Sequence, residues 1–158
     1  MREILFRGKR KSNGEWIEGF YFEKRNPCSE DGKPVRYCIS DVPPFGADIL
    51  PETLGQFTGL YDKNGTKIFE GDIVEFTSPD YMGISERGEV IFKDGCYGVS
   101  YVSEFSRKLK SRHRYEYFHR IGQIDKWQDM GASGTITYTY EVLGDVWDSP
   151  ELLEGERE

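Results

Sequence analysis

Short runs of alternating apolar and polar residues, separated by glycine-containing turns, make up much of the chain. Such runs indicate β-strands, and Asn-Gly or Asp-Gly between two of them is typical of a tight hairpin, whose turn positions need a positive φ. Three turns of this kind are flanked by apolar arms: Asn13-Gly14, Asn64-Gly65 and Asp94-Gly95. The pattern therefore predicts a mainly β fold in which successive short strands form a small antiparallel barrel with additional hairpins.

The centre of the chain carries the clearest turn signals. Asn64 and Gly65 are predicted to set the register of the strands on either side of them. Gly71 and Asp72 are predicted to turn the chain into the next strand, which begins at the β-branched residue Ile73. We therefore interpret these four residues as structural turn positions.

The rest of the chain is less uniform. Residues 24–34 are charged and contain proline and glycine, which predicts an exposed loop. Residues 104–134 fit the spacing of a helix and of a strand equally well, so their secondary structure stays open. The composition of residues 135–142, rich in threonine and tyrosine, predicts one strand. Ser149 can serve as the N-cap before Pro150, which predicts a short C-terminal helical turn.

Length and composition limit the class of protein. A chain of 158 residues can bury a core without disulfides or metals. It has no long apolar run, which excludes a transmembrane helix and leads us to expect no membrane partner. Residues 1–7 become charged at once, so we expect a cytoplasmic protein rather than a secreted one. The net charge of −7 argues against a generic nucleic-acid binder.

The cysteines and histidines provide a weak metal-site pattern. A site of two cysteines and two histidines would have to combine Cys28 and Cys38 with His113 and His119. The cysteines are not in a C-x-x-C pair and lie far upstream, and the third cysteine, Cys96, makes their number odd. We therefore expect reduced thiols and neither a metal nor another cofactor.

Three acidic residues near the centre offer an enzymatic alternative. Glu70, Asp72 and Glu75 lie close together in the sequence, and clustered carboxylates can serve acid/base or divalent-metal chemistry. Asp72 falls in a turn and Glu75 in the following strand, and no acid/base partner is evident. A metal-dependent hydrolase is therefore a weaker hypothesis than a protein without catalytic activity.

A basic, aromatic stretch over residues 107–120 contrasts with the acidic remainder of the chain. It contains six Lys or Arg residues against one Glu. Arginines for phosphates and rings for base stacking are what single-stranded nucleic-acid binding uses. Alternatively, these charges pair with acidic residues of this chain or of a neighbouring subunit. The candidate nucleic-acid contacts are Arg107, Lys108, Lys110, Arg112, Arg114, Tyr115, Tyr117 and Arg120.

Four segments together resemble the YopX family of phage and prophage proteins: residues 4–9, 15–19, 51–74 and 141–153. The central segment begins Pro-Glu-Thr-Leu-Gly-Gln-Phe-Thr-Gly-Leu-Tyr-Asp-Lys-Asn-Gly, which is similar to the family's hallmark. The resemblance implies a mainly β protein with an SH3-type, partly open barrel, from a temperate phage or an integrated prophage. It implies no particular reaction and supplies no catalytic residues.

These observations define the expected organisation and function. We expect an N-terminal hairpin segment over residues 1–48 and an SH3-like barrel over residues 49–158, with an insertion at about 104–134. The alternative is that the hairpin segment and the barrel form one structural unit. We expect a non-enzymatic protein-interaction or assembly module that associates with itself or with phage or host proteins in the bacterial cytoplasm. Single-stranded nucleic-acid binding through residues 107–120 is the alternative function.

Overall fold

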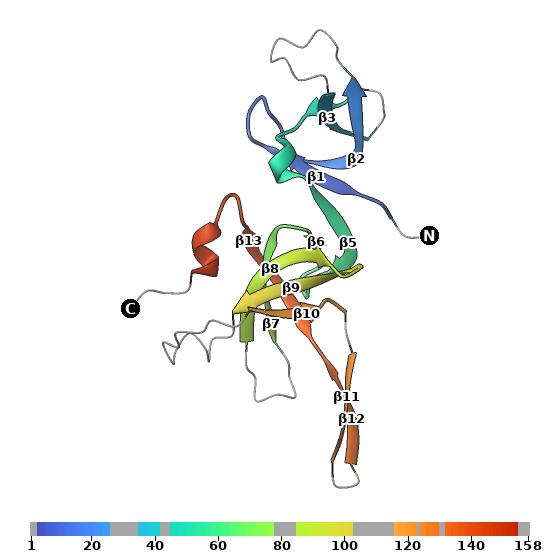
Figure 1. The fold of residues 1–158 in the computed structure, drawn as a ribbon, viewed down its shortest axis with the longest axis vertical. Coiled ribbons are helices and arrows are strands. Elements are labelled where there is room, and N and C mark those ends of the chain that lie inside the picture. The colour runs from blue at the N-terminus through green and yellow to red at the C-terminus, as the bar shows by residue number, and fades with distance from the viewer. Residues whose placement is uncertain are drawn as a thin grey trace. The chain divides into compact units, whose positions relative to one another are not determined.

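The computed structural model describes residues 3–25, 35–41, 45–77, 85–102, 116–122, 124–129 and 132–154 (Figure 1). They belong to two compact units, Met1–Gly59 and Leu60–Glu158. All strand pairs are antiparallel, and the helices in the described residues are two short 3-10 turns, so the prediction of a mainly β fold is confirmed. Within the described residues, no helix has the length and apolar character needed to cross a membrane.

The first unit is built around a hairpin and the strands that extend it. The turn residue Gly14 has a positive φ of +74°, as predicted, whereas Asn13 does not have a positive φ. Its strands pair in the order β4-β3-β2-β1-β5, and β5 continues into the second unit. The elements of this unit are β1 (Phe6–Lys9), β2 (Trp16–Arg25), β3 (Val35–Ser40), β4 (Ala47–Asp48), the 3-10 turn η1 (Pro51–Thr53) and the start of β5 (Gly55–Tyr61).

The boundary between the units falls within β5, later in the chain than the expected boundary after residue 48. Strand β1 explains why β5 begins in the first unit. Phe6 is paired with Gln56, and the Phe57 amide donates to the carbonyl of Leu5 at 2.8 Å. Thr53 ties η1 to the same strand, because its hydroxyl accepts the Lys9 amide at 2.8 Å.

The second unit contains a five-stranded antiparallel sheet in the order β10-β9-β8-β7-β13 (Figure 1). Asp94 and Gly95 both have a positive φ in the turn between β8 and β9, as predicted for this hairpin. The outer strands β10 and β13 do not pair with each other, so the described strands form no closed barrel. The strands are β6 (Lys67–Phe69), β7 (Asp72–Thr77), β8 (Ser85–Lys93), β9 (Cys96–Val102), β10 (Glu116–Arg120) and β13 (Thr139–Asp145).

One face of this sheet is apolar. Residues directly opposite one another on neighbouring strands share a face, and the register places Val90 opposite Val99 and Phe76 opposite Tyr140. These four side chains are buried in one hydrophobic cluster. The cluster consists of Ile68, Val74, Phe76, Val90, Val99, Ile121 and Tyr140.

The single strand expected over residues 135–142 is wrong, because the strand is interrupted at Tyr138. The chain changes pairing partner at this point: β12 (Ala132–Thr137) pairs with β11 (Ile124–Asp129), whereas β13 pairs with β7. Within residues 104–134 the structure describes strands at 116–120, 124–129 and 132–134, so the strand interpretation holds for these residues. Residues 103–115 lie outside the described residues.

The C-terminal helical turn is present as the 3-10 turn η2 (Pro150–Leu153). Ser149 precedes it, but the predicted capping hydrogen bond from its side chain is absent. The turn before η2 is organised by Asp145 instead. Its Oδ1 accepts the amides of Trp147 and Asp148, both at 2.9 Å.

Candidate functional site

The structure describes two of the eight candidate nucleic-acid contacts. Tyr117 and Arg120 lie on β10 and both are exposed. Three positions separate them, so they stand on opposite faces of the strand and do not form one surface. The other six candidates lie outside the described residues: Arg107, Lys108, Lys110, Arg112, Arg114 and Tyr115.

Tyr117 belongs to a pair of stacked tyrosines where β9 ends and β10 begins. It is directly opposite Tyr101, and the ring centroids are 5.5 Å apart at an interplanar angle of 29°. Tyr117 is 43% exposed, whereas Tyr101 also packs edge-on against Phe76 at 5.0 Å. Burial, and then the nearby Glu86 carboxylate, raise the pKa of Tyr101, so its hydroxyl stays protonated at neutral pH. The pair therefore presents the exposed ring of Tyr117, which is supported by the packed ring of Tyr101.

His119 is a residue that sequence reasoning placed only in a metal site or a basic surface. Its Nε2 lies 2.9 Å from the hydroxyl of Tyr140. The imidazole is stacked on Phe76 with centroids 5.1 Å apart and contacts Tyr138 at 4.2 Å. This imidazole therefore packs among core aromatic rings and links β10 to β13 by a side-chain hydrogen bond.

Strand β10 also carries an edge of the sheet. It pairs with β9 on one side, and no described strand pairs with its other side. The Ile121 amide donates to the Tyr97 carbonyl at 3.1 Å, so Ile121 faces β9. Backbone groups alternate in direction along an antiparallel strand, so Phe118 and Arg120 direct their N–H and C=O groups away from β9. We call this side of the strand the β10 edge.

The opposite edge of the same sheet, on β13, is covered by the chain itself. The Lys63 amide donates to the Tyr140 carbonyl at 2.9 Å. The Val142 amide donates to Oδ2 of Asp62 at 3.1 Å. Protected edges do not recruit additional strands. The β10 edge is therefore the side of this sheet that remains available for strand addition within the described residues.

Asp62 has a structural role that sequence reasoning did not single out. Its side chain is 8% exposed and Oδ1 accepts the amides of Asn64 and Thr66, both at 2.8 Å. Burial alone would raise its pKa, but the amides of Val142, Thr66 and Asn64 together outweigh burial and hold the pKa below its ordinary value. An aspartate two residues before Asn-Gly is the sequence signal for such a side-chain-stabilised turn.

The four predicted turn residues occupy two successive turns. Gly65 and Gly71 each have a φ of +82°, a conformation that favours glycine. The Asn64 amide is held by Asp62, and Asp72 is 1% exposed with its Oδ2 accepting the Phe69 amide at 2.7 Å. These residues therefore act through backbone conformation and hydrogen bonding to backbone amides.

The acidic residues proposed for hydrolysis do not form a metal-binding group. Asp72 is engaged in its turn, and Glu75 lies 3.4 Å from the guanidinium of Arg87. Among the described residues, no three His, Cys, Asp or Glu side chains are placed to hold a metal ion. For the cysteine–histidine alternative, Cys28 and His113 lie outside the described residues, and Cys38 and His119 belong to different units.

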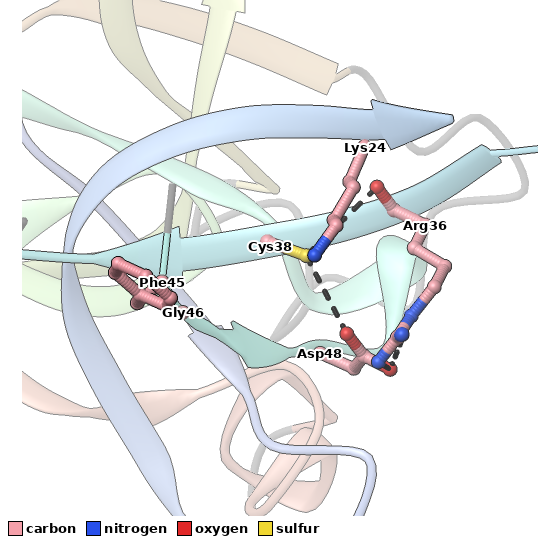
Figure 2. A pocket seen from close by; sticks show the side chains of 6 residues that line it. All are labelled: Lys24, Arg36, Cys38, Phe45, Gly46 and Asp48. Atoms are coloured by element: carbon pink, nitrogen blue, oxygen red, sulfur yellow. Dashed lines mark hydrogen bonds and ion pairs between the residues drawn. The ribbon is translucent and has the colours of Figure 1, made fainter. Parts of the chain in front are cut away.

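A small pocket lies in the first unit (Figure 2). Its volume is about 200 Å³, below the range of typical ligand pockets. Arg36 Nε donates to Asp48 Oδ2 at 2.8 Å, and the Cys38 thiol donates to Oδ1 of the same carboxylate at 3.4 Å. The lining residues are Lys24, Arg36, Cys38, Phe45, Gly46 and Asp48.

Burial, followed by the hydrogen bond to Asp48, raises the pKa of the Cys38 thiol. The thiolate is the nucleophilic form of cysteine, so Cys38 is a poor nucleophile at neutral pH. The pocket is therefore small, and its Arg36, Cys38 and Asp48 side chains are hydrogen-bonded to one another. The β10 edge is the stronger candidate for function.

Comparison with known proteins places the chain in a family. The family model described as "YopX protein" matches residues 5–154. The chain belongs to the YopX family. This confirms the resemblance that the four sequence segments indicate. The SPbeta prophage-derived uncharacterized protein YopX of Bacillus subtilis (strain 168) is 34% identical over 92 residues, which cover 58% of this chain and 53% of that protein. The match thus spans about half the length of this relative.

A solved structure is also similar to the chain. The crystal structure of protein EF1440 from Enterococcus faecalis aligns with 97% of this chain and 99% of its own. The sequence identity is 20% and the TM-score is 0.45. A TM-score of this size does not establish a common fold, so the YopX family assignment rests on the sequence matches.

Proposed function

We propose that this YopX family protein is a non-enzymatic assembly module that binds protein partners by strand addition at the β10 edge, in the cytoplasm of a prophage-carrying bacterium. The observation that carries the proposal is the difference between the two edges of the five-stranded sheet. Asp62 and Lys63 cover β13, whereas no described strand covers β10. Exposed N–H and C=O groups bind extended segments of other chains through main-chain hydrogen bonds.

The finer fold assignment is part of this proposal. We infer an SH3-type, partly open barrel in the second unit. Its support is that β13, the last strand, lies beside β7. The His119 ring of β10 also reaches the Tyr140 hydroxyl of β13. This hydrogen bond joins the two outer strands across the opening of the barrel.

A proline substitution tests whether partners bind at the β10 edge. Arg120→Pro removes a backbone donor that faces away from β9, a position at which a sheet tolerates proline. Arg120→Ala is the matched control, because it removes the same charge and keeps the donor. We expect affinity purification of the tagged full chain from prophage-induced cells to recover the same proteins with wild type and, in lower yield, with Arg120→Ala, and to lose them with Arg120→Pro.

The recovered proteins include untagged copies of this chain when these are co-expressed. Equal thermal stability of the two variants establishes that the proline acts on binding rather than on folding. An identical set of proteins with Arg120→Pro and wild type would overturn the proposal of strand addition at β10.

The stacked tyrosines favour single-stranded nucleic-acid binding as the second candidate function. Tyr101 and Tyr117 mark the ends of the segment that carries the basic residues in the sequence. The exposed ring of Tyr117 would stack on a base while arginines of residues 107–114 contact phosphates.

Salt dependence tests this second function. We expect a fluorescent oligothymidine to bind the full chain at low salt, and Arg112→Ala with Arg114→Ala to lower the slope of log affinity against log salt by about 2. Tyr117→Ala removes a stacking ring and is expected to weaken binding at every salt concentration. Arg25→Ala, an exposed change in the first unit, is the control. Absence of binding at low salt would contradict this function.

A further inference from the structure

The sequence of β10 is suited to pairing with itself. In the order Glu116, Tyr117, Phe118, His119, Arg120, the strand has an acidic residue at one end and a basic residue at the other. An antiparallel pair reverses one strand relative to the other. Two copies of β10 centred on Phe118 therefore place Glu116 of each copy opposite Arg120 of the other, so opposite formal charges stand at directly opposed positions.

We propose that the β10 edge pairs antiparallel with β10 of a second copy of this chain, about a two-fold axis at Phe118. This inference rests on the proposed function and names its partner. It joins the five-stranded sheets of two protomers into one continuous sheet.

The backbone directions fit this register. Phe118 and Arg120 direct their N–H and C=O groups toward the β10 edge, and the alternation gives Glu116 the same direction. In the register centred on Phe118, Phe118 lies opposite Phe118 of the second copy, and Glu116 lies opposite Arg120. Both residues of each such pair direct their backbone groups toward the other strand. Such opposed residues exchange two N–H···O bonds. A shift by two positions leaves one of these residues without a counterpart, so the centred register forms the most hydrogen bonds.

The other edge of the sheet explains why the partner is a single second copy. Strand β13 is covered by Lys63 and Asp62, so a strand cannot add there while these bonds hold. Among the described strands, each five-stranded sheet then has one edge for addition, and the two β10 edges of a dimer cover each other. The assembly closes at two copies with identical surfaces in contact, which is the commonest symmetry of homo-oligomers.

A charge swap tests the register. With Arg120→Glu, an acidic residue of one copy lies opposite an acidic residue of the other at each end of the interface. With Glu116→Arg, a basic residue lies opposite a basic residue at each end. We expect each single change to raise the dimer dissociation constant roughly tenfold, because opposed charges in a sheet contribute modestly at each of two symmetric positions. The double variant Glu116→Arg/Arg120→Glu restores opposite charges and is expected to restore the wild-type dissociation constant.

Sedimentation equilibrium of the purified full chain measures this constant, which we expect in the micromolar range for a short interface. Slowed hydrogen exchange of the Phe118 and Arg120 amides on dimer formation is expected as well. A wild-type chain that stays monomeric at about 100 µM overturns the inference. A dimer that the charge swap does not restore, or that leaves these amides unprotected, also overturns it.

The two proposals fail in different ways. If the purified chain is monomeric but Arg120→Pro still abolishes recovery of cellular partners, self-pairing is wrong and strand addition to another protein stands. If Arg120→Pro changes neither the mass of the purified chain nor the recovered partners, the proposed function itself is overturned.

Discussion

Replacement of Gly71 by alanine is expected to lower the free energy of unfolding by about 3 kcal/mol. Gly71 has a φ of +82°, which costs free energy for any residue with a Cβ. An added Cβ would also lie 2.2 Å from Cη2 and 2.4 Å from Cζ3 of Trp147, well inside contact distance. The backbone has little freedom to move away. The Gly71 amide donates to the Val90 carbonyl at 2.8 Å, and its carbonyl accepts the Val146 amide at 3.0 Å.

Gly65 provides the matched control for this prediction. It has the same φ of +82°, but a Cβ there would have no atom within 4 Å. We expect Gly65→Ala to cost about 1 kcal/mol, the conformational part alone. The difference between the two variants, measured by urea-induced unfolding of the full chain, isolates the contact with Trp147. Equal losses at the two positions would show that this contact does not determine the cost.

A double-mutant cycle separates the steric cost further. In a Trp147→Ala background, the ring that a Cβ at residue 71 meets is absent. Gly71→Ala is then expected to lower the free energy of unfolding by about as much as Gly65→Ala, because the positive φ is the cause that the two positions share. If Gly71→Ala is as costly without the indole as with it, the backbone rather than the ring is the source of the destabilisation.

These glycines show which parts of the fold the sequence predicts. Asn64-Gly65 and Asp94-Gly95 could be recognised because a hairpin turn depends on the conformation of two adjacent residues. The close approach of Gly71 to Trp147 depends on a contact between distant parts of the chain. The interruption at Tyr138 depends likewise on which strands pair, since the local composition of residues 135–142 is suitable for a strand throughout.

The candidate site was predictable only in part, for the same reason. Tyr117 and Arg120 could be selected by residue type, because rings and arginines suit nucleic acid. The β10 edge could not, since an edge is defined by the order of strands in the sheet rather than by the composition of one strand. His119 was placed in a basic, exposed run, but strand alternation and the register with β9 direct it toward Phe76.

Replacement of Asp62 by alanine is the second change with a large expected effect, a loss of about 3 kcal/mol in the free energy of unfolding. Its carboxylate accepts three backbone amides, of Asn64, Thr66 and Val142, at 2.8 to 3.1 Å. Removing it leaves buried donors without an acceptor and releases the cover of the β13 edge. Asp62→Asn keeps an acceptor oxygen and is expected to lose about half as much. Glu52→Gln, an exposed change, serves as the control.

The stabilisation from Asp62 is expected to depend on pH in a direction that follows from its pKa. The pKa of the folded state lies below its ordinary value, so the folded protein holds the ionised form more strongly than the unfolded chain does. The contribution is therefore fully present above the unfolded pKa of about 3.9, and it is lost as the pH falls through the folded pKa. The Asp62→Asn variant has no titrating carboxyl group at this position. The difference in unfolding free energy between wild type and this variant is expected to stay constant from about pH 7 to 5 and to shrink below about pH 4. An equal difference at about pH 7 and about pH 3 would show that the carboxylate charge does not stabilise this turn.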